Sequence, residues 1–314
     1  MSVSVTGTDT RALVVVRPTT ITPDNLLSTN LAFSDYEPWS PTKDYAKGDR
    51  IASHTTLSVY ESLTSDNTGN DPLDTGSSDW VRVGPVNQFA AFDVSTSTAT
   101  VSADDITYVI NPGQSINCVS FLDFSGVSEI TVTLRSGQAQ DDPVVYQKVI
   151  ETGSYSISSS WWGFFFGQRF EQKQAVLLDL PNYPDCRLEI EIIGSGDISI
   201  GTIIIGQNEP FGKGIELGAR VGIQDYSRKE TNEFGDTVLV KRAFAKRANF
   251  DLMIGKGEVD ALQNFLAMIR AEPVLWVGTT EYEATVIFGF YRTFEILISY
   301  PTYSMCELQI EGLT

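Results

Sequence analysis

The side chains that could carry out acid–base catalysis are few, beginning with a single histidine, His54. A serine hydrolase needs a histidine base beside an activated serine, and the chain has no G-x-S-x-G motif to supply that serine. A histidine-based metal centre needs further histidines, which are absent from the sequence. We therefore interpret His54 as a surface or half-buried polar residue, and we predict no metal and no cofactor.

Paired carboxylates are the second type of candidate. Glycoside hydrolysis needs two carboxyl groups at a set separation, but a chain with 40 acidic residues offers many such pairs by composition alone. Glu189 and Glu191 lie two residues apart in a segment that alternates with apolar residues, which is typical of the solvated face of a strand. The sequence thus predicts a protein that is not an enzyme.

A run of aromatic residues is the most unusual local feature. Trp161, Trp162 and Phe165 belong to the segment WWGFFF at 161–166. In an extended chain, neighbouring side chains point to opposite faces, so a single core could not take them all. We predict an interface formed by Trp161, Trp162 and Phe165, and we keep two alternatives: a platform on which sugars stack, or a β-corner that fills two cores.

Composition narrows the partners and the compartment. The 314 residues have a formal net charge of −18, which argues against nucleic-acid binding because phosphate contacts need concentrated positive charge. Cys118, Cys186 and Cys306 are far apart in sequence, which favours buried or half-buried thiols in a reducing compartment. The sequence has no secretory signal and no long apolar run, so we expect synthesis in the cytoplasm without membrane insertion.

Most of the chain has the pattern of short β-strands. Runs rich in Val, Ile and Thr alternate with turn formers such as Asn111-Pro112-Gly113 and Gly194-Ser195-Gly196. Regularly spaced short strands are typical of a β-sandwich or jelly roll. One helix is predicted near residues 257–271, where apolar residues recur at helical spacing and Pro273 follows. The basic residues of the segment KRAFAKR, which include Lys246, are assigned to a solvated strand edge.

These patterns divide the chain into four parts. We predict an extended N-terminal arm over 1–30, a small three-stranded module over 31–86, a jelly-roll-like β-sandwich over 87–212, and an α+β domain over 213–314. The last boundary follows a change in charge balance, since the first 212 residues carry most of the negative charge. The arm offers an apolar strand at 12–16 that needs a sheet partner, either in a neighbouring chain or in a later domain of the same chain.

The module resembles a known family. Its sequence contains, in order, Trp39, Tyr45, Gly48-Asp49, Tyr60, Pro72 and Trp80. This order and spacing are similar to those of the small chitinase-type carbohydrate-binding modules, in which aromatic faces stack on sugar rings. The resemblance implies sugar-binding candidates at Trp39, Tyr60 and Trp80. Gly48-Asp49 is expected to form a hairpin turn, and the aromatic residues are expected to supply most of the core.

The residues after the module sharpen the resemblance. The segment GPVNQFAAFD at 84–93 is similar to a junction found in structural proteins of tailed-bacteriophage virions, which place such a module ahead of a β-sandwich. The resemblance implies a virion component in the tail tip, baseplate or fibre-attachment region. Its expected partners are other tail proteins and copies of itself, with host-surface glycan as a further candidate. The alternatives are a carbohydrate-binding protein that recognises the host surface and, less favoured, a glycan-degrading enzyme.

Overall fold

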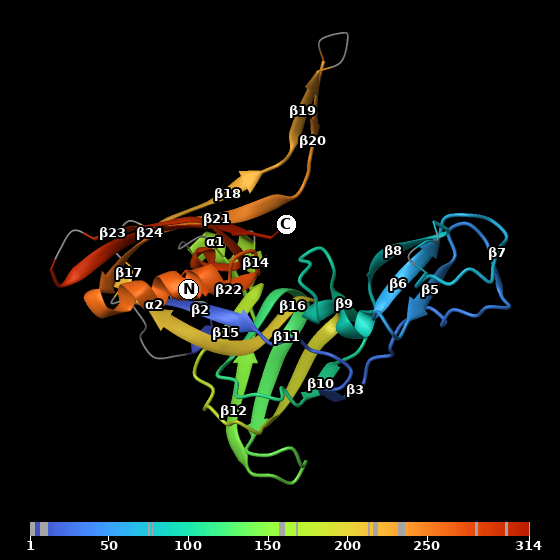
Figure 1. Cartoon of the computed structure of the whole chain (residues 1–314), viewed down its shortest axis with the longest axis horizontal. Coiled ribbons are helices and arrows are strands. Elements are labelled where there is room, and N and C mark those ends of the chain that lie inside the picture. The colour runs from blue at the N-terminus through green and yellow to red at the C-terminus, as the bar shows by residue number, and fades with distance from the viewer. Residues whose placement is uncertain are drawn as a thin grey trace.

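The computed structural model describes residues 4–6, 12–74, 76, 78–156, 161–167, 169–212, 214–215, 219–231, 236–279, 282–298 and 301–313. The fold is mainly β, as the sequence predicts, and within the described residues fifteen strands join into one sheet. Figure 1 shows this sheet as the body of the molecule, with the module to one side and a hairpin rising above it. The first part of the sheet contains β1 (Ser4–Thr6), β2 (Leu13–Pro18), β3 (Leu26–Thr29), β9 (Thr100–Ser102), β10 (Ile106–Ile110), β11 (Cys118–Arg135), β12 (Val144–Glu151), β15 (Gln174–Leu177) and β16 (Arg187–Phe211).

The second part of the sheet is antiparallel and carries the predicted helix. Its strands are β17 (Gly214–Ile215), β18 (Arg220–Asp225), β21 (Phe244–Gly255), β22 (Val274–Val277), β23 (Val286–Leu297) and β24 (Tyr303–Gly312). Two 3₁₀ turns, η2 (Lys256–Glu258) and η3 (Glu283–Thr285), lie between these strands, and α2 (Val259–Met268) follows η2. The Glu258 carboxylate accepts a hydrogen bond from the Gly255 amide at 3.1 Å, which caps the start of this helical segment. Leu262 and Leu266 of α2 are buried, so the helix covers the core of this part.

Strand β2 joins the two parts of the sheet. It pairs with β16 on one side and with β22 on the other. Its residues Leu13 and Val15 pack into the C-terminal core, while Val14 and Val16 pack into a separate cluster between the two parts. A strand buried on both faces needs a continuous apolar run, and LVVV supplies one. Of the two partners predicted for this strand, the one in a later part of the same chain is confirmed, and the segment is therefore not part of a separate N-terminal arm.

The predicted boundary near residue 212 does not separate two sheets. The end of β16 pairs with β2, which pairs with β22, so the hydrogen-bonded ladder continues across this position. At the crossing, a side chain on Gly206 would collide with the Arg17 carbonyl of β2, which explains the glycine. The change in charge balance near residue 212 therefore reflects a difference in surface charge between the two parts of the sheet and does not mark a domain boundary.

The longest strands, β11 and β16, run beside each other through the middle part. The Gly194–Gly196 segment, which the sequence assigns to a turn, lies inside β16, and the pairing register shifts opposite it at Gly126. Gly126 has φ of +72° and touches the Asp197 carbonyl, a position that no larger residue fills without strain. The glycines thus make a β-bulge that bends two long strands, and the large core cluster lies within the bent sheet.

The small module contains a three-stranded sheet, as predicted, with a two-stranded ladder beside it. The sheet is formed by β5 (Arg50–Ser53), β6 (Ser58–Ser62) and β8 (Trp80–Pro85), and the ladder by β4 (Asp44–Tyr45) and β7 (Asn67–Thr68). Gly48-Asp49 connects β4 to β5, which do not pair, so it is a turn but not the predicted hairpin. The hairpin turn between β5 and β6 is formed by residues 54–57.

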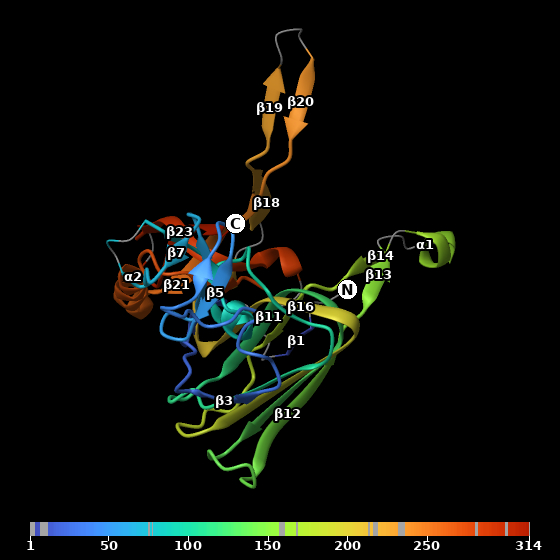
Figure 2. The same cartoon turned by 90° about the vertical axis from the view of Figure 1, so that its right-hand side faces the viewer.

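Two hairpins project from this body in different directions (Figure 2). The first consists of β13 (Ser154–Ser156) and β14 (Arg169–Glu171) and carries the short helix α1 (Trp161–Phe166) at its end. The second consists of β19 (Arg228–Thr231) and β20 (Thr237–Val240) and follows β18. We call them the aromatic arm and the long arm.

Candidate functional site

The aromatic residues of the module are largely used in its own core. Trp80 is only 8% exposed, its ring contacts Tyr45 edge-on at 5.1 Å, and its Nε1 donates a hydrogen bond to the Asn70 carbonyl at 3.0 Å. A ring held in this way offers no open face to a sugar. The structure therefore confirms the expected core role of Trp80 and corrects its assignment as a sugar-binding residue.

Trp39 and Tyr60 lie at the edge of the same core and are half-buried. The Tyr60 hydroxyl donates to Thr56 Oγ1 at 3.1 Å, which ties the ring to the hairpin turn that precedes β6. The Nε1 of Trp39 is buried and has no hydrogen-bond partner within the described structure. Trp39 and Tyr60 thus keep part of their ring surface exposed to solvent. They do not form an open aromatic platform together with Trp80.

His54 has a packing role at the border between the module and the body. Its ring stacks on Phe33 with centroids 3.8 Å apart and planes 13° apart. A groove beside this pair is lined by Leu26, Leu57 and Phe89. In the described part of the chain, no hydrogen bond joins His54 to a serine, so the geometry provides no nucleophile–base pair.

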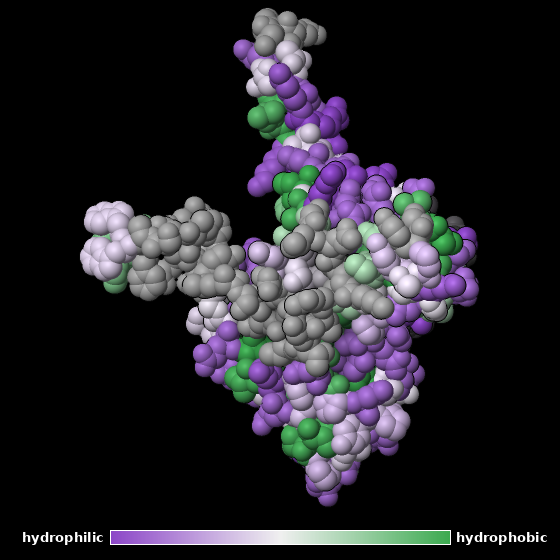
Figure 3. Space-filling view, turned by 90° about the vertical axis from the view of Figure 1, so that its left-hand side faces the viewer, coloured by the Kyte–Doolittle hydropathy of each residue, from purple (hydrophilic) through white to green (hydrophobic). Residues whose placement is uncertain are grey.

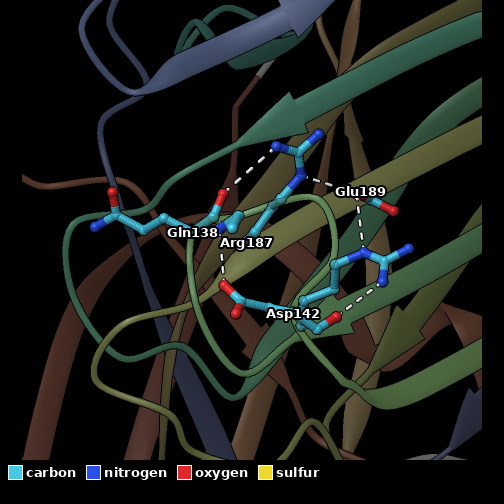
Figure 4. A network of polar contacts seen from close by, with 6 residues as sticks. Gln138, Asp142, Arg187 and Glu189 are labelled. Carbon is cyan, nitrogen blue, oxygen red and sulfur yellow. Dashed lines mark hydrogen bonds and ion pairs between the residues drawn. The ribbon is translucent and has the colours of Figure 1, made fainter.

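Glu189 is a structural carboxylate (Figure 4). Its Oε1 accepts from Arg187 Nε at 2.8 Å and from Arg135 Nε at 3.1 Å. Arg135 also donates to the Asp142 carbonyl at 2.9 Å, and the Asp142 carboxylate accepts from the Ala139 amide at 2.7 Å. The network ties the loop between β11 and β12 to the sheet. The two arginines thus make Glu189 part of a structural ion-pair network.

A polar cluster missed by the sequence analysis lies in a pocket between the two parts of the sheet. Lys246 of β21 is half-buried there beside Asp123, Glu283 and Gln174. With the Gln174 amide oriented to satisfy both of its ends, its oxygen accepts from Lys246 Nζ and its nitrogen donates to the Glu283 carbonyl at 3.3 Å. Lys246 is therefore not on the solvated edge predicted for its segment. Its partners come from three distant segments, which no local pattern could indicate.

Burial dominates the electrostatics of this cluster. It lowers the pKa of Lys246, while the nearby carboxylates of Asp123 and Glu283 act in the opposite direction. Burial also raises the pKa of Glu283, and Lys246 opposes that shift. The arrangement is a partly desolvated ion cluster that joins β11, β15, β21 and η3. The cluster contains no nucleophile aligned with a base. We interpret it as a structural contact between the two parts of the sheet.

The predicted interface residues stand apart from all these clusters, on the aromatic arm. The segment forms a helix and not the extended chain assumed from the sequence. Trp161 and Trp162 are 73% and 67% exposed, and Phe165 and Phe166 are exposed too. Figure 3 shows the arm projecting away from the body. These side chains form the most prominent aromatic surface in the described part of the molecule.

The three thiols are buried, as the sequence predicts. Burial is the main cause that raises the pKa of Cys186 and of Cys306 to about 11, and it raises the pKa of Cys118 further. At pH 8 such a thiol is about one-thousandth thiolate. We expect Ellman's reagent to react with the native chain at least about one hundred times more slowly than with the chain in guanidinium, where three thiols react. One fast equivalent in the native chain would contradict this assignment.

Taken together, the body is a mainly β, sandwich-like scaffold with an appended module and two projecting arms. Within the described residues, no cluster of His, Cys, Asp and Glu could hold a metal ion, and no helix is long and apolar enough to cross a membrane. Comparison with protein-family models, curated proteins and solved structures found no match for this chain.

Proposed function

We propose that the chain is a structural component of a tailed-phage virion, located in the tail tip, baseplate or fibre-attachment region, where it binds copies of itself or neighbouring virion proteins. The observation that carries the proposal is the long arm. Strands β19 and β20 pair only with each other within the described structure. An isolated two-stranded hairpin is marginally stable in water, so a neighbouring molecule is the natural source of further contacts.

The surface of the long arm supports the same conclusion. Leu239 is 75% exposed and Val238 is exposed as well, while Arg228, Lys229 and Glu230 supply charges of both signs. Apolar anchors with a polar rim are typical of protein–protein interfaces. Apolar residues held this far from the core contribute little to the stability of the chain itself. On a projecting arm they can instead contact an adjacent subunit.

The junction after the module, on which the virion resemblance partly rests, has a structural role in the fold. Asn87 anchors it to β9, because its Nδ2 donates to the Val101 carbonyl and its Oδ1 accepts from the Val101 amide, both at 2.9 Å. Val86 is fully buried, and the Asp93 carboxylate accepts from the Thr98 hydroxyl at 2.9 Å. These contacts give the GPVN and FD segments a defined role in fixing the module to the body.

Glycan recognition as the main function has weaker support. The module retains partial exposure at Trp39 and Tyr60, but Trp80 is committed to its core. A sugar-binding surface usually combines open aromatic faces with nearby polar groups. We therefore favour a spacer role for the module within an assembly, with sugar contact as the alternative. The enzyme alternative has no described nucleophile–base or acid–base pair to support it.

The test of the proposal is a Leu239→Asp variant of the full chain. We expect its unfolding temperature to stay unchanged, because Leu239 contacts solvent in the isolated chain. Loss of an interface anchor costs about 2 kcal/mol, so incorporation into particles should fall by roughly thirty-fold. Immunogold labelling and quantitative blotting of purified virions measure it.

A Val149→Asp variant serves as the matched control, because Val149 is exposed on β12 of the body and lies outside the long arm. It should enter particles at the wild-type level. Equal incorporation of the Leu239→Asp chain would show that the long arm is not an assembly contact. Failure to detect the wild-type chain in any particle would overturn the virion proposal as a whole.

A further inference from the structure

The aromatic arm ends in a helix whose exposed aromatic residues cover adjacent faces. Trp161 stacks near Phe165 with ring centroids 5.0 Å apart, and Trp162 near Phe166 at 4.3 Å. Residues four apart share a face, and successive residues lie 100° apart around the helix axis. The two pairs therefore occupy neighbouring faces. A flat protein groove contacts one stripe of a helix, so a partner that covers both pairs has to surround the tip.

The charge distribution singles out the same segment. The chain as a whole has a net charge of −18, yet residues 152–170 contain no acidic residue and a single basic one, Arg169. The segment that leads to the helix is rich in serine, an uncharged residue. The arm thus carries an uncharged aromatic tip on an acidic protein, and Figure 2 shows α1 held away from the body.

We propose that this tip, Trp161–Phe166, inserts into the interfacial region of a lipid bilayer. Trp is enriched at that interface because its ring is apolar and its N–H is polar, and Phe extends deeper into the acyl chains. A bilayer surrounds an inserted helix on all faces, and it takes an uncharged tip without leaving a charge unpaired. Six helical residues span only about 9 Å, far less than the roughly 30 Å of the hydrocarbon core, so the insertion is shallow.

The proposal changes one expectation from the sequence. The absence of a spanning segment suggested no membrane insertion, and no described helix is long enough to cross a bilayer. Shallow insertion of four aromatic side chains needs no spanning helix. The inference depends only on the tip and not on the virion assignment, so each can fail separately.

The experiment uses the full chain and vesicles of phosphatidylcholine. Co-sedimentation measures binding. Tryptophan emission measures the environment of the rings, since transfer from water to a bilayer shifts it to the blue, and the contribution of Trp161 and Trp162 to the emission of the five tryptophans is the part that the four-site variant below lacks. In the variant with Trp161, Trp162, Phe165 and Phe166 all changed to Ser, we expect at least a ten-fold loss of vesicle binding and no lipid-dependent shift. Thermal unfolding should be unchanged, because these side chains are exposed.

The matched control removes apolar surface from the other arm. A Val238→Ser, Leu239→Ser variant should bind vesicles like the wild type, because these residues belong to β20. Absence of wild-type binding to vesicles, or equal binding by the four-site variant, would overturn the proposal. Self-association of the wild-type chain without lipid that the four-site variant lacks would also overturn it, because the tip would then be a protein contact.

Discussion

Replacing Val15 with Asp is expected to abolish the folded state. Val15 is fully buried in β2, and the new carboxylate would lie in the C-terminal core beside residues such as Trp276 and Phe250. An unpaired charge in an apolar core costs several kcal/mol, and the stability of a whole protein is about 5–15 kcal/mol. The substitution also disturbs a strand whose two neighbours, β16 and β22, lie in different parts of the sheet.

Thermal unfolding followed by circular dichroism, together with size-exclusion chromatography, measures this effect. Val149→Asp is the matched control, because Val149 is 47% exposed on β12 and the same change there should alter the free energy of unfolding by no more than about 0.5 kcal/mol. If the Val15→Asp chain melted with the wild type, β2 could not be an internal strand. The same reasoning predicts that deletion of residues 1–30 unfolds the main sheet. If these residues were a detachable arm, the deletion would leave the sheet folded.

The second large effect is local to the module. Trp80→Ala removes the largest ring from a core that otherwise consists of Tyr45 and Ile51, with Trp39 and Tyr60 packed against it. Truncating a buried aromatic residue costs about 3–5 kcal/mol, which is more than a module of this size can lose. We therefore expect β5, β6 and β8 to unfold while the main sheet stays folded.

Hydrogen exchange resolved by segment is the measurement, with near-ultraviolet dichroism as a second readout. In the Trp80→Ala variant, amides of the module should exchange at rates close to those of an unfolded chain, and amides of β11 and β16 should keep their protection. Trp162→Ala is the control, because Trp162 lies exposed on the aromatic arm and its loss should leave both regions protected. Unchanged protection in β5, β6 and β8 after Trp80→Ala would contradict the assignment of Trp80 to the core.

Local patterns predict well the elements whose stability is decided locally. The helix at 259–268 follows from the spacing of Leu262, Leu266 and Ile269, and the LVVV run predicts a strand. Local patterns do not predict which strands pair with each other, because the pairing of Val15 with Trp276 depends on the whole fold. The same limit explains the placement of Lys246 beside Gln174 and Glu283, which come together only after the two parts of the sheet meet.

The errors at glycines and aromatic residues have a different cause. Gly194 and Gly196 have the composition of a turn, but the adjoining strand pairs on both sides of them, so they form a bulge. Aromatic residues favour strands by propensity, yet the segment 161–166 forms a short helix at the end of a hairpin. Burial is no easier to infer, since the pattern that identifies Trp80 as a module residue does not tell a packed ring from an open one.

The position of β2 also determines when the protein can fold during translation. Trp276, the partner of Val15 in β22, is synthesised 261 residues after it. At about 5–20 residues per second, the interval is roughly 15–50 s. Throughout that time the apolar strand has at most one of its two sheet neighbours, and it exposes an unpaired edge of the kind that recruits other chains. We therefore expect nascent chains to need protection from aggregation until β22 emerges.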